Sequence, residues 1–348
     1  MKGPGRQLKG LGLAPFRHRS QNFLKDVGAA ARMAAIVMAE ARTNLSGAAG
    51  GFAEGPGKCP ETGPREPAPA PEAGSGIRPG AAGVQVSAGR AEPGSGSVRD
   101  AAGDIPSASA PEVLEVGPGL GALTRPLLDL GLRVRAVELD RGLCLQMSGW
   151  PEAASGALDL LCSDVLKLPA GSAFIHGVRC VCGNLPYGIT TPFLFWFLSA
   201  TGGTVPGVFM VQKEVAARLA AGPGTGDYGR LSVAMGSWFE VREAFTLGPG
   251  AFHPRPKVES AVAVLSPRRE LPSLLSPEAL GRMTRICFHS RRKTLINNLA
   301  CAFPRGRALA ALEALGLDGA RRPEELTPLD YQRLTAELGG AGAGPADA

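Results

Sequence analysis

The sequence of 348 residues predicts a doubly wound α/β fold with a mostly parallel sheet, followed by a small all-helical C-terminal domain. The first supporting observation is a regular alternation of short apolar runs with helical patterns between about residues 110 and 265. The second is a glycine-rich turn between the first of these runs and a helix. The third is the purely helical pattern from Ser276 onward.

Composition divides the chain further. Residues 1–15 form a basic segment that we expect to be a flexible tail, and residues 339–348 form a second one. Residues 45–110 consist mainly of Gly, Ala, Pro and Ser without periodicity, which predicts a disordered low-complexity insertion. The closure cost of such a loop grows only logarithmically with length, so the core tolerates it. The folded parts are then residues 16–268 and a helical domain at 269–338.

Charge and cysteine content narrow the class of protein. The formal net charge is +6, which suggests an anionic partner without naming it. Seven cysteines occur with no C-x-x-C pair, so we expect neither a zinc site nor a disulfide framework, and no metal at all. This cysteine usage suits a reducing cytoplasm. No apolar run reaches the roughly 18 residues of a membrane span, so no membrane association is expected.

The glycine-rich turn lies between two predicted strands. The first strand covers Val113–Val116 and leads into Gly117, Gly119 and Gly121; a helix with leucines at helical spacing through Leu130 follows. The second strand runs from Arg133 to Glu138. An acid about 20 residues after such a turn accepts hydrogen bonds from ribose hydroxyls. The G-x-G-x-G spacing lacks the third glycine of a pyrophosphate site, so S-adenosylmethionine fits; the alternative is an ordinary βα turn.

The remaining elements follow in order. A helix begins after Asp26, the expected N-cap. Polar residues at strand ends predict a ligand site, because ligands of such sheets bind beyond the carboxyl ends of the strands. These residues are Gly117, Glu138, Asp164 and Asn184. The further predicted strands are 158–161, 178–182, 207–212, 231–239 and 261–265, and the helices are 193–198, 213–219, 276–288, 291–302, 307–315 and 328–338.

Asn184-Leu185-Pro186-Tyr187 is the most informative tetrapeptide. The exocyclic amine of a nucleobase is a poor nucleophile because its lone pair is delocalised into the ring. The Asn184 side-chain oxygen and the Leu185 carbonyl can accept both N–H groups, on a turn that Pro186 stiffens, and hold the nitrogen in line with a sulfonium methyl. Tyr187 would stack on the base. The alternative is a plain strand-to-loop turn with a partly buried tyrosine.

Together these motifs resemble the ribosomal small-subunit RNA adenine dimethyltransferase family, with a Rossmann-like class I methyltransferase sheet. The resemblance extends over nearly everything outside the tails and the insertion. Two departures are Ser20, where the family usually has glycine, and the insertion itself. The matching segments are Gln21–Leu24, Glu115–Gly121, Glu138, Asp164, Asn184–Tyr187, Tyr228–Ser232, Phe252–Val258, Arg291–Leu295 and Asn297–Leu299.

The resemblance implies roles for individual residues. Glu138 would take the ribose hydroxyls of S-adenosylmethionine and Asp164 its adenine amine, while Phe252 would stack on the target adenine opposite Tyr187. The implied substrate is a pair of adjacent adenosines in the 3′-terminal hairpin of 16S rRNA, dimethylated at N6 in the immature small subunit, with the enzyme acting as a monomer. The cofactor contacts so implied are Asn22, Leu24, Gly117, Gly119, Glu138, Asp164 and Asn184.

A cluster of basic residues provides candidate RNA contacts that position a substrate without determining its sequence. They are Arg255, Lys257, Arg291, Arg292 and Lys293. A solvated helix face is the alternative for the last three.

Two other functions stay open at this point. One is methylation of a single adenine in 23S rRNA, against which the Phe252–Val258 and Arg291–Leu299 motifs argue. The other is a non-catalytic assembly or transcription factor, against which the intact Asn184–Tyr187 motif and the acid at Glu138 argue.

Overall fold

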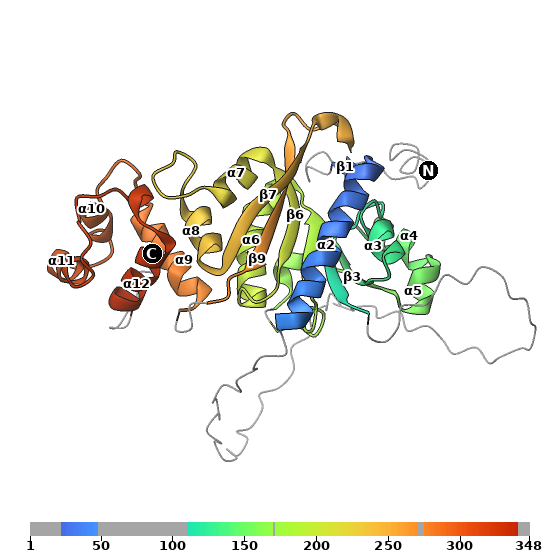
Figure 1. The fold of residues 1–348 in the computed structure, drawn as a ribbon, viewed down its shortest axis with the longest axis horizontal. Helices are drawn as coiled ribbons and strands as arrows, with labels where there is room; N and C mark the ends of the chain where they lie inside the picture. Colours follow the sequence, from blue (N-terminus) through green and yellow to red (C-terminus); the bar gives the residue numbers. More distant parts are fainter. Residues whose placement is uncertain (1–21, 48–109, 170, 271–274, 340–348) are drawn as a thin grey trace, which may run out of the picture. The chain divides into compact units, whose positions relative to one another are not determined.

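The computed structural model describes residues 22–47, 110–169, 171–270 and 275–339. Ser20, Gln21, the N-terminal tail, nearly all of the predicted insertion and nearly all of the C-terminal tail lie outside these ranges. Figure 1 shows the fold with its elements labelled.

Seven strands form the main sheet of the described chain, in the order β4-β3-β2-β5-β6-β9-β7. Neighbours from β4 to β6 are parallel, whereas β9 is antiparallel to both β6 and β7. The predicted doubly wound, mostly parallel sheet is confirmed. The strands are β2 (Glu112–Val116), β3 (Arg133–Glu138), β4 (Leu158–Cys162), β5 (Cys180–Asn184), β6 (Gly207–Gln212), β7 (Phe239–Leu247) and β9 (Ser260–Pro267).

Helices cover both faces of this sheet. In β2, Val113 packs in one buried cluster with α2 (Val27–Gly47) and α3 (Thr124–Asp129), and the next residue, Leu114, packs in another cluster with α6 (Thr190–Thr201). Alternation along a strand sends successive side chains to opposite faces, which is why both faces are apolar. In Figure 1, α2 crosses in front of the sheet and α6 lies behind it.

Several local predictions are confirmed. Asp26 caps α2, since its Oδ1 accepts from the Ala29 N–H at 2.9 Å. Ser276 caps α9 (Pro277–Cys287) in the same way, at 3.1 Å from the Ala279 nitrogen. The other sheet-side helices are α4 (Arg141–Ser148), α5 (Pro151–Ser155) and α7 (Lys213–Ala220), with 3₁₀ turns η2 (Val165–Lys167), η3 (Tyr187–Ile189) and η4 (Pro249–Ala251).

The predicted strand at 231–239 is wrong. This segment is the helix α8 (Arg230–Trp238), and the strand β7 begins only at Phe239. Consecutive residues Val233, Ala234 and Met235 are all buried because neighbouring helices pack around α8. A helix buried on several sides loses its 3.6-residue polar pattern, so a short apolar run does not distinguish it from a strand.

The predicted helix at 291–302 is much shorter in the structure, where α10 covers only Leu295–Leu299. The buried Asn298 side chain explains this difference, because it accepts from the Ser290 N–H at 3.0 Å and donates to the Ser290 carbonyl at 3.0 Å. These bonds hold a turn where a continuous helix would need its own backbone pairs.

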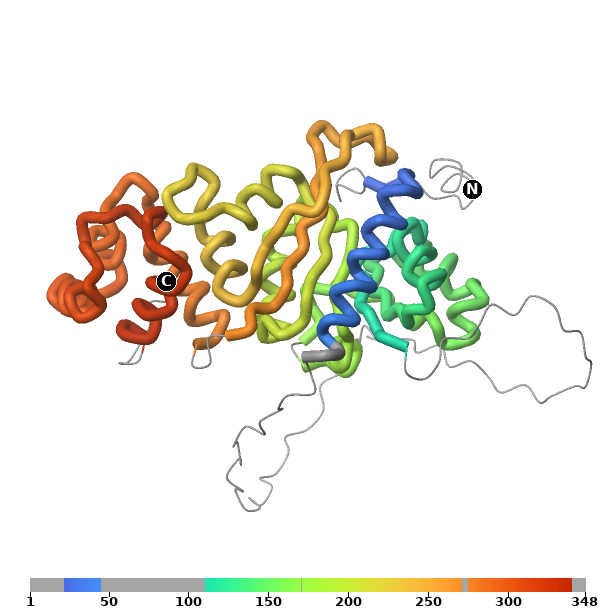
Figure 2. Tube along the Cα trace, in the orientation of Figure 1, coloured from blue at the N-terminus to red at the C-terminus, as the bar shows by residue number. Residues whose placement is uncertain are grey.

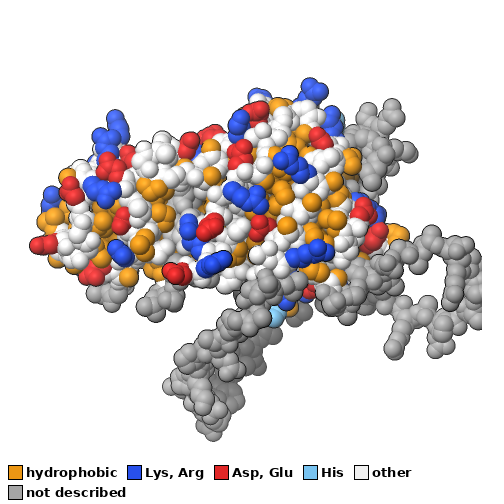
Figure 3. Space-filling model, in the orientation of Figure 1, with side chains coloured by type: hydrophobic (Ala, Val, Ile, Leu, Met, Phe, Trp, Pro, Cys, Tyr) orange, Lys and Arg blue, Asp and Glu red, His pale blue; other side chains and the backbone are white. Residues whose placement is uncertain are grey.

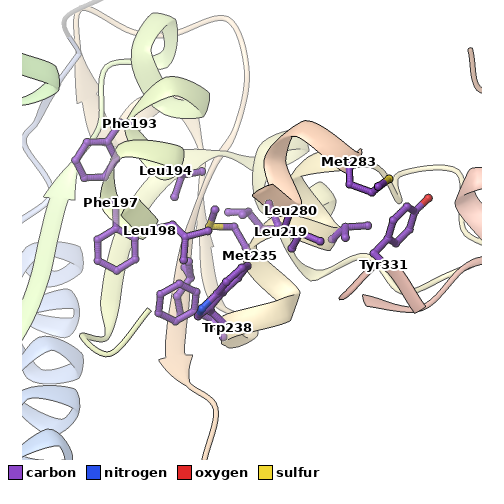
Figure 4. Close-up of a cluster of buried hydrophobic side chains, with 14 of the residues drawn as sticks. Phe193, Leu194, Phe197, Leu198, Leu219, Met235, Trp238, Leu280, Met283 and Tyr331 are labelled. Carbon is purple, nitrogen blue, oxygen red and sulfur yellow. The ribbon is translucent and has the colours of Figure 1, made fainter. Parts of the chain in front are cut away.

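The C-terminal helices share a buried core with the helices of the sheet. Figure 4 shows Met283 of α9 and Tyr331 of α12 (Pro328–Gly339) in one apolar cluster with Met235 and Trp238 of α8. The remaining elements are α11 (Arg305–Ala314) and η5 (Pro323–Glu325). Figure 2 traces the chain from the sheet into these helices. The division of the chain at residues 268 and 269 stays a prediction.

Among the described helices, none is both long enough and apolar enough to span a bilayer.

Candidate active site

A pocket opens at the carboxyl ends of β2, β3 and β5, with a free volume of about 80 Å³. The short strand β1 (Phe23–Leu24) closes one side of it and pairs antiparallel with β8 (Phe252–His253). The pocket gathers residues that are far apart in sequence. Its lining consists of Asn22, Phe23, Leu24, Met33, Glu115, Gly117, Pro118, Gly119, Leu120, Ala122, Leu123, Glu138, Asn184, Leu185, Pro186 and Tyr187.

The glycine turn forms the floor of the pocket. Gly117, Gly119 and Gly121 all have positive φ, at 68°, 58° and 80°. Only glycine adopts this backbone region without strain, so the turn needs glycine at each position. A Cβ at Gly119 would also lie only 3.1 Å from the Phe23 ring. The turn explains why α3 begins at Thr124 instead of near Leu120.

Glu138 fastens this turn to the end of β3. Its Oε2 accepts from the Gly119 N–H at 3.1 Å and its Oε1 accepts from the Asp140 N–H at 2.9 Å. The side chain is only 5% exposed, and burial raises the pKa of the carboxyl above its usual value. The two N–H groups lower this pKa, but burial has the larger effect. Glu138 lines the pocket, and its role toward a ribose stays a prediction.

Glu115 is a site residue that the sequence analysis did not single out. It lies in β2, is 1% exposed and lines the pocket, and its Oε2 has no hydrogen-bond partner. Burial raises its pKa to about 8; the Thr124 hydroxyl opposes the shift and Glu138 adds to it. An acid between the apolar Leu114 and Val116 was the signal in the sequence. A cationic ligand would favour the ionised form of this buried carboxyl, and S-adenosylmethionine carries positive charge at its methionine end.

The Asn184–Tyr187 turn lines the same pocket, at the end of β5, the strand that pairs with β2. The Asn184 Nδ2 donates to the Asn22 carbonyl at 2.8 Å, which leaves the amide oxygen as the acceptor on the other side of the group. The Leu185 N–H donates to the Met210 carbonyl at 3.1 Å and fixes that peptide against β6. The half-buried Tyr187 shares a 2.7 Å hydrogen bond with the buried Ser260, and burial raises its pKa.

Two of the predicted residues do not line the pocket. Asp164 follows β4 as predicted, but its Oδ1 caps η2 by accepting from the Leu166 N–H at 3.0 Å. Phe252 is 1% exposed and packs in the same buried cluster as Leu24 and Met33. Their roles toward adenine and the target base stay predictions.

The predicted RNA contacts lie on the surface. Arg255, Lys257, Arg292 and Lys293 are exposed. Arg291 is exposed as well, but its guanidinium donates to the carbonyls of Gly226 and Tyr228, so it also ties the 290–294 turn to the loop before α8. In Figure 3, Lys and Arg side chains lie over the end of the molecule where β7 and β8 meet.

In the described part of the chain, no group of three or more His, Cys, Asp or Glu side chains is arranged to hold a metal ion.

Trp150 supports the glycine turn from below, and the sequence analysis missed this contact. A Cβ at Gly121 would lie 2.2 Å from the indole ring, so the two groups are in close contact. The Arg125 guanidinium covers the ring at 3.6 Å from its centroid and forms an ion pair with Glu152. The backbone N–H of Arg125 also donates to the Gly121 carbonyl at 3.1 Å, so Arg125 contacts both the glycine turn and Trp150.

A seven-stranded sheet with one reversed strand, a glycine turn after β2 and an acid at the end of β3 defines a class I methyltransferase that uses S-adenosylmethionine. The family model for ribosomal RNA adenine dimethylase matches residues 107–339. The chain belongs to this family and is an S-adenosylmethionine-dependent rRNA adenine dimethyltransferase.

Known relatives agree with this assignment. Ribosomal RNA small subunit methyltransferase A of Pseudomonas fluorescens is 42% identical over 228 residues, which is 65% of this chain and 83% of the relative. The protein of the same name from Legionella pneumophila is 42% identical over 223 residues, covering 64% and 84%. The crystal structure of a dimethyladenosine transferase from Plasmodium falciparum superposes with a TM-score of 0.55 at 25% identity, covering 67% of this chain and 91% of that one.

We expect Glu115→Gln to stabilise the protein at pH 8 while it weakens cofactor binding. Between about pH 4.5 and 8 the folded protein holds a proton that the unfolded chain releases, so stability falls as the pH rises through this window. The amide removes that penalty, which is on the order of 4 kcal/mol at pH 8 and below about 1 kcal/mol at pH 5. Urea unfolding at both pH values and calorimetric titration with S-adenosylmethionine measure the two effects. Equal destabilisation at both pH values would contradict this account of Glu115.

We expect Gly121→Ala to raise the KM for S-adenosylmethionine by about tenfold or more, because the new methyl would overlap the Trp150 ring. In the Trp150→Ala background the same change should cost much less, since the clash is gone and only the strain at a φ of 80° remains. A double-mutant cycle on KM measures this coupling. Gly131→Ala is the matched control, with a φ of 78° and no neighbouring atoms. Additive effects of the two changes would exclude the support role of Trp150.

Proposed function

We propose that this enzyme dimethylates N6 of two adjacent adenosines in the 3′-terminal hairpin of 16S rRNA during maturation of the small ribosomal subunit. The observation that carries the proposal is that Asn184 and Leu185 line the same pocket as the glycine turn and Glu138. The small-subunit methyltransferases that are 42% identical to this chain support the choice of substrate.

In this proposal the cofactor supplies an electrophilic methyl on a sulfonium at the pocket. Glu138 accepts from the ribose hydroxyls, Glu115 faces the cationic methionine end, and Asp164 accepts from the adenine amine. Asn22 and Leu24 close over the cofactor from β1. The fit rests on the unpaired Glu115 oxygen and on the open backbone of the glycine turn.

The target amine is activated by hydrogen-bond acceptors in this mechanism. The Asn184 amide oxygen and the Leu185 carbonyl accept the two N6 hydrogens, which localises the nitrogen lone pair toward the methyl group. The Asn22 carbonyl holds the Asn184 amide in the required orientation. No ionised base is needed in the transfer step, since the sulfonium charge is neutralised as the methyl leaves.

Tyr187 and Phe252 enclose the target base in this proposal. Tyr187 is partly exposed at the pocket, so its ring is available for stacking. Phe252 is buried and pairs through its backbone with Leu24 across the β1–β8 ribbon. For Phe252 to reach the base, the ribbon must shift, and closure of β1 over the cofactor is the motion that would supply the shift.

The proposal also covers where the enzyme acts and how it contacts the small subunit. The enzyme would act as a cytoplasmic monomer on immature small subunits. Arg255, Lys257, Arg292 and Lys293 would contact phosphates, and Arg291 would combine such a contact with its structural bonds.

Nucleoside mass spectrometry of rRNA from cells with and without the gene tests the function. We expect the two adjacent N6,N6-dimethyladenosines of 16S rRNA to disappear without the protein and to return with the wild-type chain, but not with Asn184→Ala, which removes an acceptor of the reacting amine. Loss of a modified adenine in 23S rRNA instead would replace the proposed substrate. Unchanged rRNA in both subunits would favour a non-catalytic role.

We expect Glu138→Ala to reduce affinity for S-adenosylmethionine by at least a hundredfold while rRNA binding stays near wild type. The change removes the ribose acceptor and also releases the Gly119 and Asp140 N–H groups. Calorimetry with the cofactor and filter binding with immature small subunits measure the two affinities separately. Glu240→Ala, at an exposed acid on β7, is the control. A parallel loss of both affinities would contradict separate cofactor and RNA surfaces.

A further inference from the structure

A second cavity lies beside the β1–β8 ribbon, between the first turns of α2 and the end of β7. Its volume is about 490 Å³, within the roughly 300–1,000 Å³ typical of ligand pockets. We call it the α2–β7 cavity. None of the roles derived above uses it. Its lining consists of Asp26, Gly28, Ala29, Arg32, Phe245, Thr246, Leu247, Gly248, Gly250 and Ala251.

One wall of the α2–β7 cavity is a flat cationic surface. The Arg32 guanidinium lies over the Phe245 ring, 4.1 Å from its centroid, and Arg32 is exposed. A guanidinium that already lies on an aromatic ring keeps its planar face in a fixed position, and nucleobases stack on such planes. The acid in the lining, Asp26, has its Oδ1 engaged with the Ala29 N–H at the start of α2.

Glycines keep the cavity open although the backbone does not require them. Gly248 has φ −72° and ψ 162°, a conformation that any residue adopts. A Cβ at Gly248 or at Gly250 would meet no atom within 4 Å. The free volume therefore depends on the absence of side chains and not on the course of the chain.

The α2–β7 cavity adjoins the methyl-transfer pocket through the ribbon. The Lys25 N–H donates to the Ala251 carbonyl at 2.9 Å, directly after the Leu24–Phe252 pair. On α2, Met33 lines the pocket and its neighbour Arg32 lines the cavity. Figure 1 shows the start of α2 next to the connection between β7 and β8.

We propose that the α2–β7 cavity binds the unstacked nucleobase next to the adenosine that is being methylated. This inference rests on the proposed function, in which the substrate has two adjacent target adenosines. When one base leaves the stack to enter the pocket, its neighbour loses a stacking partner, and the Arg32–Phe245 plane replaces it. Lys25 directly after β1, and Arg255 and Lys257 shortly after β8, are exposed and supply positive charge for the phosphates that link the two nucleotides.

Gly248→Phe tests the proposal because it fills the cavity without backbone strain. We expect its KM for immature small subunits to rise about tenfold and its products to shift toward modification of one adenosine of the pair, with the KM for S-adenosylmethionine unchanged. Gly306→Phe, at an exposed glycine of α11 with equally open surroundings, is the matched control and should behave as wild type. Arg32→Ala removes the stacking plane at an exposed position and should reproduce the effect even if Gly248→Phe folds poorly.

A hairpin RNA with an abasic site next to the target adenosine completes the test. Fluorescence anisotropy should show weaker binding of this RNA to the wild type, and no additional weakening in Arg32→Ala. The inference would be overturned if Gly248→Phe and Arg32→Ala both kept the wild-type KM and product ratio. It would also be overturned if the abasic site weakened RNA binding equally in the wild type and in Arg32→Ala. If the wild type itself leaves small-subunit adenosines unmodified, the proposed function fails instead, so the two failures are distinguishable.

Discussion

Two buried carboxylates at the ends of adjacent strands set the electrostatics of the site. Glu115 and Glu138 lie on β2 and β3, and the charge of Glu138 adds to the rise in the pKa of Glu115 that burial causes. Glu138 is held by two backbone N–H groups, whereas Glu115 Oε2 has no partner. A cationic ligand lowers the cost of both charges. In the proposed mechanism methyl transfer removes the sulfonium charge, so this pair would favour the substrate form of the cofactor over its product.

The sequence could predict the parts of the site that follow local rules. Gly117, Gly119 and Glu138 were predictable because a positive φ demands glycine and because parallel strands bring their carboxyl ends to one edge. Glu115 was harder to assign, since the importance of this acid shows only in the structure, where it is buried and its Oε2 has no hydrogen-bond partner.

Other features of the site and fold could not be predicted, because they depend on contacts between segments that are distant in the sequence. Trp150 contacts Gly121 across the fold, and the local sequence around either residue does not indicate this contact. The predicted strand at 231–239 was wrong because α8 is buried on several sides by neighbouring helices, so Val233–Met235 form an apolar run without the polar stripe of a surface helix. Whether Phe252 faces the core or a bound base depends on the position of a two-residue ribbon, and residue types alone do not determine that position.

The β1–β8 ribbon pairs a residue of the pocket with the residue that is predicted to bind the target base. One strand carries Leu24, which lines the cofactor pocket, and the other carries Phe252, the predicted partner of the target base. A shift of one strand moves the other, because antiparallel backbone pairs resist separation. In the proposed mechanism, where Leu24 closes over the cofactor and Phe252 stacks on the target base, this pairing would couple cofactor binding to base binding, and linkage requires that each strengthens the other by the same factor. Such coupling would let RNA engage productively only when a methyl donor is in place.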